Sequence, residues 1–370
     1  MMLSDNYFGG VTMLLGVDYY PEQWEAERLE EDLDGIVELG CNVIRIGEFA
    51  WHVMEPEEGR FDFSFFDRVI KKAGERGLSI IFGTPTAAPP AWLAHRYPDV
   101  LSVDENGLRR AFGGRHVACY SSPDYLEHCE KITRALLEHY RGEERIAAWQ
   151  IDNELGHEGS DKCFCSNCRR RFQNFLSAKH GDVSRLNAAW GTVFWGQEYN
   201  DFSEIPLPAP TITTHNPSLR LDWERFRSES IVRFAAFQAQ LLREIIPDAV
   251  IIHDFPGGGL GKHADYSAVA KHLDVAAYNN YPVWGGQREP LPPNEIAFGL
   301  DYIRGLKRQN FWITEAMPIP FTALLPIFLF PMLGITGGYA EIVDSARIIQ
   351  RMTELLLSEA YHAERRVVGE

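Results

Sequence analysis

The sequence contains 370 residues, enough for one large domain or two ordinary ones. Its 45% apolar and 24% charged residues are typical of a globular protein, and its net charge of −16 argues against a nucleic-acid partner, which requires clustered Lys and Arg. The longest apolar stretch, residues 323–335, is interrupted by Pro326, Pro331 and Gly334. We therefore expect no membrane span, which needs about 18 consecutive apolar residues.

The chain begins with a polar, aperiodic segment, residues 1–13, which we expect to be a disordered leader. This segment lacks a basic region followed by an apolar core, so it does not resemble a secretory signal. Six cysteines in a chain of this size do not indicate a disulfide-stabilised scaffold. Together these features predict a reducing, cytoplasmic setting.

From residue 14 onward, apolar segments alternate with segments of helical periodicity. The pattern predicts seven strands, at residues 14–20, 42–49, 78–84, 146–154, 249–255, 273–281 and 311–315. Helices are predicted at residues 27–39, 63–76, 122–140, 219–246 and 295–307. Gly40 and Gly77 should end the first two helices, and Ser122 should begin the third. A long insertion, residues 156–217, follows the fourth strand.

This alternation predicts an α/β fold, a (β/α)8 TIM barrel that occupies residues 14–370 as a single domain. A doubly wound open sheet is the alternative, although no Gly-x-Gly-x-x-Gly follows the first strand. The alternation of predicted strands and helices ends after Glu315. Residues 334–339 make a poor eighth strand that contains two glycines, residues 345–361 have helical character, and residues 365–370 resemble a tail. We therefore expect irregular or incomplete closure at strand eight.

Two glutamates stand at the carboxyl ends of predicted strands, Glu154 after the fourth and Glu315 after the seventh. In a barrel both should face the same mouth, where enzymes of this fold place their chemistry. Glycoside hydrolysis uses two such groups, one to protonate the leaving oxygen and one to attack the anomeric carbon. Barrels of many chemistries carry carboxylates there, and a strand end that merely reaches water is the alternative for Asn153 and Glu154.

The neighbours of these glutamates have candidate roles of their own. Asn153 is positioned to hydrogen-bond a sugar hydroxyl, whereas Trp149 points to the opposite face and should belong to the core. Tyr281, at the end of the sixth strand, has two readings. Its phenol could bind and orient Glu315, or it could be an aromatic residue at the barrel rim.

Charged residues also end two other strands. Arg45 and Glu48, on the second strand, should form an ion pair beneath the site. A structural role for this pair is at least as well supported as contact with the substrate. His253 and Asp254 end the fifth strand, and for them we favour a solvated strand end over a functional role.

Three cysteines of the insertion lie within six residues: Cys163, Cys165 and Cys168. A structural zinc ion binds four thiolates in a tetrahedron, so this cluster lacks one ligand. Cys119 is the best fourth, because it lies in the loop after the third strand, at the same mouth of the barrel. A closed site of this kind would be structural and would fix the insertion beside the fourth strand. Cys41 and Cys129 are expected to be core thiols.

Several segments together resemble a known family. They are residues 15–24 (LGVDYYPEQW), 45–51 (RIGEFAW), 61–63 (FDF), 151–154 (IDNE) and 279–282 (NNYP), with the cysteine cluster. In this order they resemble the β-galactosidases of glycoside hydrolase family 42, over residues 14–315. The resemblance implies a (β/α)8 catalytic domain that cleaves terminal non-reducing β-D-galactosides with retention of configuration.

The resemblance also implies individual roles. Glu154 matches the acid/base of the family and Glu315 its nucleophile, while Arg115 and Asn153 match substrate contacts. The zinc ligands of the family match four cysteines: Cys119, Cys163, Cys165 and Cys168. Family members are longer and form homotrimers through a second domain.

The segment after Glu315 departs from the family pattern. Members usually continue with a Gln and a Pro-Gly loop that ends in a Trp lining the sugar site, whereas residues 316–321 here are AMPIPF. Two alternatives to a β-galactosidase follow. One is a weakly active or non-catalytic zinc-binding barrel, and the other is a related glycosidase with a different sugar preference.

Overall fold

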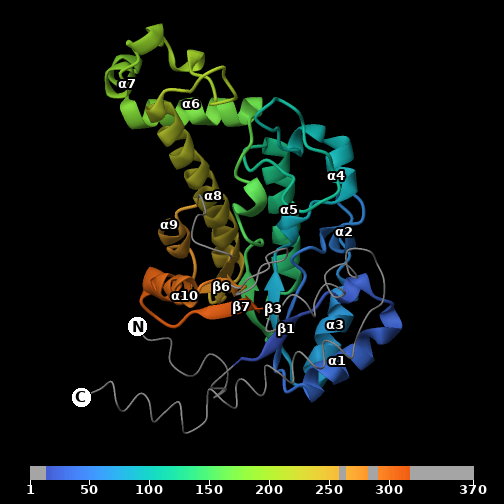
Figure 1. Ribbon diagram of the computed structural model, residues 1–370. Coiled ribbons are helices and arrows are strands. Elements are labelled where there is room, and N and C mark those ends of the chain that lie inside the picture. Colours follow the sequence, from blue (N-terminus) through green and yellow to red (C-terminus); the bar gives the residue numbers. More distant parts are fainter. Residues whose placement is uncertain (1–13, 258–263, 282–290, 317–370) are drawn as a thin grey trace, which may run out of the picture.

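The computed structural model describes residues 14–257, 264–281 and 291–316 of the chain (Figure 1). Seven strands form one parallel sheet whose order in space is their order in the sequence. They are β1 (Gly16–Asp18), β2 (Val43–Ile46), β3 (Ser79–Gly83), β4 (Ile146–Gln150), β5 (Ile251–Phe255), β6 (Val275–Asn280) and β7 (Trp312–Ala316). Because consecutive strands are neighbours throughout, the sheet curls into a nearly closed barrel, and the doubly wound alternative, which reverses its order at a switch point, is excluded.

Helices connect the strands. Those around the sheet are α1 (Leu29–Glu38), α2 (Trp51–Met54), α3 (Ser64–Glu75), α4 (Ala91–Arg96), α5 (Pro123–His139), α8 (Pro217–Ile245), α9 (Tyr266–Ala270) and α10 (Pro293–Lys307). The insertion after β4 contains α6 (Ser166–His180) and α7 (Val183–Trp190) and projects away from the sheet at the top of Figure 1. The long α8 returns the chain from the insertion to the barrel. Within the described ranges, no helix combines the length and the apolar content that crossing a bilayer requires.

All seven predicted strands and all five predicted helices are confirmed, with ends that shift by a few residues. Ser122 caps α5 by accepting a hydrogen bond from the backbone N–H of Tyr125 at 3.4 Å. Gly40 and Gly77 follow α1 and α3 with φ of 81° and 75°, the left-handed conformation that a helix end favours. Helices α2, α4 and α9 were not predicted, because four to six residues are too few to show helical periodicity. Helices α6 and α7 were not predicted either, since their residues were assigned only to the long insertion.

The two edges of the sheet are β1 and β7, which are not paired with each other in the described part of the chain. The residues expected to supply an eighth strand and helix, 334–339 and 345–361, lie outside the described residues, as do the expected tail and the leader 1–13. The prediction of irregular closure, and of a single domain that extends to residue 370, therefore stays a prediction.

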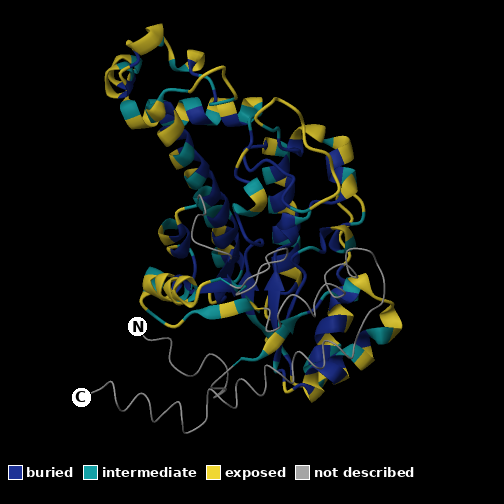
Figure 2. Ribbon diagram, in the orientation of Figure 1, coloured by how far each residue is buried: buried dark blue, intermediate teal, exposed yellow. Residues whose placement is uncertain are grey.

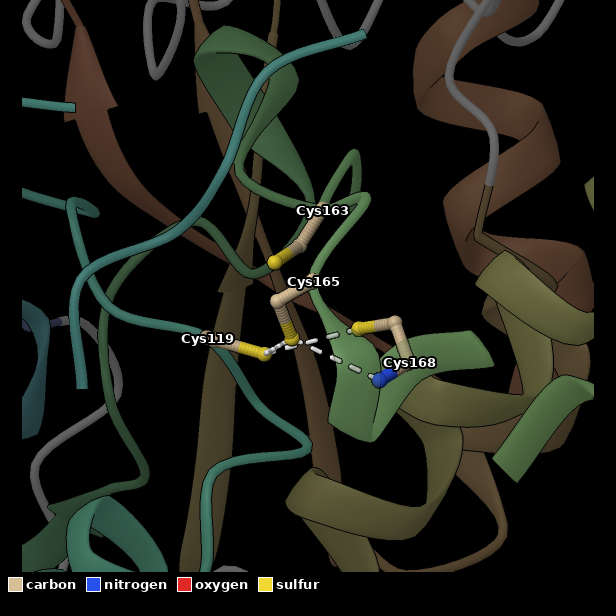
Figure 3. Close-up of side chains that lie close together, drawn as sticks. All are labelled: Cys119, Cys163, Cys165 and Cys168. Atoms are coloured by element: carbon tan, nitrogen blue, oxygen red, sulfur yellow. Dashed lines mark hydrogen bonds between the residues drawn. The ribbon is translucent and has the colours of Figure 1, made fainter. Parts of the chain in front are cut away.

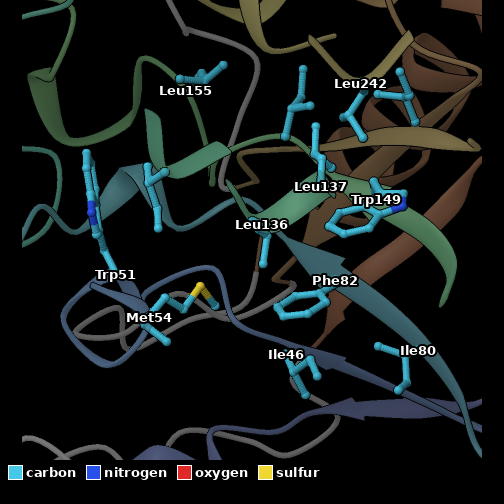
Figure 4. Close-up of a cluster of buried hydrophobic side chains, with 14 of the residues drawn as sticks. Ile46, Trp51, Met54, Ile80, Phe82, Leu136, Leu137, Trp149, Leu155 and Leu242 are labelled. Atoms are coloured by element: carbon cyan, nitrogen blue, oxygen red, sulfur yellow. The ribbon is translucent and has the colours of Figure 1, made fainter. Parts of the chain in front are cut away.

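Side chains of alternate strand residues point to opposite faces of the sheet, so they pack in two separate apolar cores. Ile81 and Ala148 face the interior of the barrel, in a small apolar cluster with residues of β2, β5 and β6. Their neighbours Phe82 and Trp149 face outward and stack on each other with ring centroids 5.5 Å apart. Figure 4 shows this pair packed among Leu136 and other apolar side chains beneath the helices. Trp149 is thus a core residue, as predicted.

The insertion has an apolar core of its own, which includes three buried cysteines. The other members come from α6, α7, α8 and the loop between α7 and α8: Phe172, Leu176, Leu186, Trp190, Ile205, Leu207, Leu219, Trp223 and Phe226. Figure 2 shows buried residues along α8 and exposed residues at the tip of the insertion. The insertion therefore packs around α8 and reaches the barrel on the side where β4 ends.

Candidate active site

The chain makes a constrained turn directly after β4. Asp152 and Glu154 have φ of 52° and 40°, a left-handed conformation that side chains other than glycine rarely adopt. Two threonines of the loop after β3 hold the turn. The backbone N–H of Asp152 donates to Oγ1 of Thr84 at 2.7 Å, and the hydroxyl of Thr86 donates to the Asp152 carboxylate. These buried contacts offset the cost of the conformation, which is about 1–3 kcal/mol per residue.

Glu154 is buried by this turn, with 2% of its surface exposed. Its Oε1 accepts a hydrogen bond from Nδ2 of Asn279 at 2.9 Å, and its Oε2 accepts one from Nη2 of Arg115 at 2.9 Å. Its backbone N–H donates to Oδ1 of Asp254 at 3.0 Å. The alternative of a strand end that merely reaches water is therefore wrong for Glu154.

Glu315, near the end of β7, is held at both oxygens. Nη2 of Arg45 donates to its Oε1 at 2.5 Å, and the hydroxyl of Tyr281 donates to its Oε2. Of the two readings of Tyr281, the contact with Glu315 is thus confirmed. Burial alone would raise the pKa of Glu315, but the charge of Arg45 and the hydrogen bond from Tyr281 outweigh it and lower the pKa. Glu315 is therefore ionised at neutral pH.

Among the described residues, the buried guanidinium of Arg45 lies within ion-pair distance of four carboxylates. It lies 2.8 Å from Asp18, 3.3 Å from Glu48, 3.3 Å from Asp254 and 2.5 Å from Glu315. The predicted ion pair with Glu48 is confirmed. One positive charge cannot balance four negative ones, and the pKa of Asp18 rises to about 8, through burial first and then through the charges of Glu315 and Glu48, against the opposing charge of Arg45.

The two glutamates belong to one hydrogen-bonded network. From Glu154 it passes to Asn279, whose Nδ2 also donates to Oδ2 of Asp254 at 3.1 Å. Arg45 then joins Asp254 to Glu315. Asn279 on β6 is also the register partner of Glu315 on β7. The structure thus brings Glu154 and Glu315 to the same mouth of the barrel, as expected from their strand positions.

The prediction of a solvated strand end for His253 and Asp254 is wrong. Their exposed fractions are 1% and 0%, because β5 lies beside β4 and the turn after β4 covers its end. Nδ1 of His253 donates to the backbone oxygen of Ile151 at 2.8 Å, and its Nε2 accepts from the backbone N–H of Leu155 at 3.2 Å. Burial lowers the pKa of His253 to about 4, so the ring is neutral at physiological pH.

Arg115 and Asn153 adjoin Glu154. The side chain of Arg115 is partly exposed, whereas Asn153 is fully buried. The amide of Asn153 makes two hydrogen bonds when its oxygen points at Arg115. The oxygen then accepts from Nη1 of Arg115 at 3.0 Å, and the nitrogen donates to Oδ2 of Asp254 at 3.0 Å. Nη2 of Arg115 also donates to Oε1 of Glu158 at 3.0 Å. The pKa of Glu158 falls to about 2, mainly through its hydrogen bond with His116 and further through Arg115, against a partial burial that would raise it.

Three residues of this network were not foreseen: Asn279, Asp254 and Glu158. The first two end predicted strands, so their position was a signal that the sequence did contain. Glu158 lies in a short 3-10 turn, His157–Gly159, and approaches Arg115 only because the segments after β3 and β4 meet, which strand periodicity does not reveal.

The four cysteines singled out from the sequence lie together. Their sulfur atoms are all within 4.8 Å of one another, and Cys119 Sγ lies 3.6 Å from that of Cys165 and 3.5 Å from that of Cys168 (Figure 3). In a tetrahedral thiolate site with metal–sulfur distances of about 2.3 Å, the sulfurs lie about 3.8 Å apart. The cluster therefore fits a metal ion. Cys41 and Cys129 lie in the main core, as predicted.

A parallel βα barrel with buried carboxylates at the carboxyl ends of its strands has the architecture of a barrel enzyme. Comparison with known proteins makes the assignment specific. A family model described as beta-galactosidase, that of glycoside hydrolase family 42, matches residues 18–323. The chain belongs to this family.

The chain is similar to curated beta-galactosidases and to solved structures. Beta-galactosidase BgaA of a Thermus species and a beta-galactosidase of Thermus thermophilus are each 41% identical over 319 residues, 83% of this chain and 49% of theirs. The beta-galactosidase structure from the psychrophilic Marinomonas ef1 has a TM-score of 0.79 and 36% identity and covers 83% of this chain and 48% of that one. The structure from Halorubrum lacusprofundi has a TM-score of 0.79, 35% identity and coverage of 83% and 47%. The chain spans about half the length of the curated relatives it matches.

Proposed function

We propose that this chain carries the active site of a retaining glycoside hydrolase that cleaves terminal non-reducing β-D-galactosides. The observation that carries the proposal is the network that links the buried carboxylate of Glu154 and the largely buried carboxylate of Glu315 at one mouth of the barrel. Family membership and the names of the relatives support a β-galactoside as the substrate.

In this proposal Glu315 is the nucleophile. The ionised carboxylate attacks the anomeric carbon, and the glycosidic bond breaks while Glu154 donates its proton to the leaving oxygen. A covalent glycosyl-enzyme results. Glu154 then takes a proton from a water molecule, whose oxygen displaces Glu315 from the sugar and returns the anomeric configuration to its original state. Arg45 and Tyr281 favour the ionised form of Glu315 that the first step requires.

Arg115, Asn153 and Tyr281 are the proposed substrate contacts. The side chain of Arg115 is 31% exposed and still reaches Glu154, so a sugar hydroxyl can approach it from the mouth. Asn153 directly precedes Glu154, and its amide oxygen accepts a hydrogen bond from Arg115. Hydrogen bonds from such groups to the sugar orient the anomeric carbon between the two carboxylates.

We further infer that the four-cysteine cluster holds a structural zinc ion. Four thiolates fill a tetrahedral site and leave no position for a reacting water molecule. The ligands come from the loop after β3 (Cys119) and from the insertion (Cys163, Cys165 and Cys168), so the ion would fix one to the other. None of the six cysteines is joined to another in a disulfide, which supports the proposal of a reducing, cytoplasmic setting.

Hydrolysis of a chromogenic β-galactoside by the purified 370-residue chain tests the proposal. Glu315→Gln and Glu154→Gln should each lower kcat by several orders of magnitude, whereas Glu127→Gln, the same change at an exposed ion pair on α5, should leave it unchanged. Proton NMR of the first product should show the β-anomer. A Gln variant at either site that turns over like the parent would refute the assignment. Faster turnover of a β-fucoside or an α-L-arabinopyranoside would assign a different sugar preference.

A further inference from the structure

Asp254 is a buried carboxylate to which the proposed reaction assigns no role. It lies near the carboxyl end of β5 and is fully buried, between the turn after β4 on one side and β6 on the other. A buried carboxylate is costly unless hydrogen bonds and charges compensate it, so its partners indicate what it does there.

Four N–H groups point at Asp254. Its Oδ1 accepts from the backbone N–H of Glu154 at 3.0 Å. Its Oδ2 accepts from Nη1 of Arg45 at 3.3 Å, from Nδ2 of Asn279 at 3.1 Å and from Nδ2 of Asn153 at 3.0 Å. All are donors, and a carboxylate only accepts, so it is the one side chain of this size that satisfies them together.

Three of these four donors belong to the surroundings of the proposed acid/base. One is the backbone of Glu154 itself, at a residue whose φ of 40° must be imposed by its contacts. Asn279 places its amide on Oε1 of Glu154, and Asn153 is the preceding residue of the same turn. Asp254 therefore fixes both the main chain of Glu154 and a side chain that orients its carboxylate.

We propose that Asp254 is a positioning residue that holds Glu154 in the orientation required for proton transfer to the leaving oxygen. The inference rests on the proposed function, because it assumes that Glu154 is the acid/base. It assigns Asp254 no contact with the substrate. Its effect is transmitted through Glu154, Asn153 and Asn279.

The choice of substrate separates this role from a general effect on folding. A galactoside with a poor leaving group, such as lactose, needs the proton from Glu154, whereas a dinitrophenyl galactoside leaves without it. Asp254→Asn replaces one acceptor oxygen with an NH₂ group that faces donors. We expect kcat/KM for lactose to fall by about 100-fold or more, and that for the dinitrophenyl substrate by about 10-fold or less.

Asp274→Asn is the matched control. Oδ2 of Asp274 also accepts from a backbone N–H, that of Ile251 at 2.7 Å, and from an arginine, Arg243, at 2.5 Å. These contacts lie at the amino end of β5, away from the site. The control should change kcat/KM for the two substrates by the same factor, as any loss of folded protein would.

Hydrogen exchange provides a readout that does not depend on activity. In Asp254→Asn, the peptide that contains residues 151–155 should exchange faster than in the parent, while core peptides of α5 should not change. Asp254→Ser, which keeps an acceptor and leaves room for a water molecule, is the second variant should Asp254→Asn fail to fold.

Equal losses on both substrates, or unchanged exchange at residues 151–155, would overturn the positioning role. A parent chain that hydrolyses neither substrate would instead refute the proposed function. The exchange measurement would then still decide whether Asp254 holds the turn that carries Glu154.

Discussion

The hydroxyl of Tyr281, which follows β6, donates a hydrogen bond to Oε2 of Glu315 on the neighbouring strand β7. Arg45 occupies the other oxygen of the same carboxylate. Neither donor can be replaced by bulk water, because Glu315 is largely buried at the mouth of the barrel. The phenol and the guanidinium together hold the carboxylate ionised and fix its direction.

Removing this phenol should alter the pH dependence of the enzyme. In Tyr281→Phe the pKa of Glu315 should rise, since one of the groups that lower it is lost. The acidic limb of the kcat/KM profile should therefore move to higher pH, and kcat/KM at neutral pH should fall about 10- to 100-fold. Tyr199→Phe, in the insertion, is the control and should show the parent profile. An acidic limb that stays in place would show that Tyr281 does not influence the ionisation of Glu315.

Glu158 should act on substrate binding through Arg115. Its carboxylate accepts from Nε of Arg115 at 3.2 Å and from Nη2 at 3.0 Å, and its pKa of about 2 keeps it ionised at working pH. Glu158→Gln weakens the hydrogen bonds that hold Arg115 in place. We therefore expect KM to rise about 3- to 10-fold with little change in kcat. Steady-state kinetics on a galactoside measure both constants. Glu57→Gln, at the exposed pair with Arg60, is the control, and a loss confined to kcat would contradict the assignment.

The fold was largely predictable because its main signals are local. Apolar runs of strand length separated by helical segments identify seven parallel strands, and the ends of strands four and seven locate Glu154 and Glu315. Tyr281 was predicted beside Glu315 because consecutive parallel strands are neighbours in a barrel, and the register of β6 on β7 bears this out.

The errors arise where neighbouring strands and loops determine burial. Asp254 and His253 end a strand in the sequence, but the turn after β4 covers them, and nothing within β5 indicates this cover. Glu158 meets Arg115 across 43 residues of chain, between two loops without a repeating pattern. The cysteine cluster was predictable for a different reason, because the close spacing of three thiols implies a fourth ligand.

The metal cluster leads to a prediction that is independent of catalysis. Elemental analysis of the purified protein should give about one zinc ion per chain. Cys119→Ser should lower this content to a small fraction and reduce the unfolding temperature by roughly 5 °C or more, because metal binding contributes to folding. Cys41→Ser, which changes a core thiol outside the cluster, should keep its zinc. A Cys119→Ser protein with a full zinc content would exclude Cys119 as a ligand.

His253 should make the fold sensitive to acid. Its ring is held neutral, with Nδ1 donating to Ile151 and Nε2 accepting from Leu155, so protonation at Nε2 would break the second hydrogen bond. Burial lowers the pKa of His253 from 6.5 to about 4. Between about pH 4 and pH 6.5, the folded state therefore binds fewer protons than the unfolded state. The stability contributed by the neutral ring is complete above pH 6.5 and is lost as the pH falls toward 4. The loss is on the order of 3 kcal/mol.

Urea unfolding followed by circular dichroism at a series of pH values from 7 to 4 measures this loss. His253→Asn keeps a donor near the position of Nδ1 but has no ring to protonate. The variant should have a lower free energy of unfolding than the parent at pH 7, and the difference between the two free energies should become smaller as the pH falls. His95→Asn, at an exposed position on α4, should follow the parent curve at every pH. If the difference in the free energy of unfolding between His253→Asn and the parent stays constant from pH 7 to pH 4, the acid sensitivity belongs to other groups, because the His253 ring is the titratable group that this substitution removes.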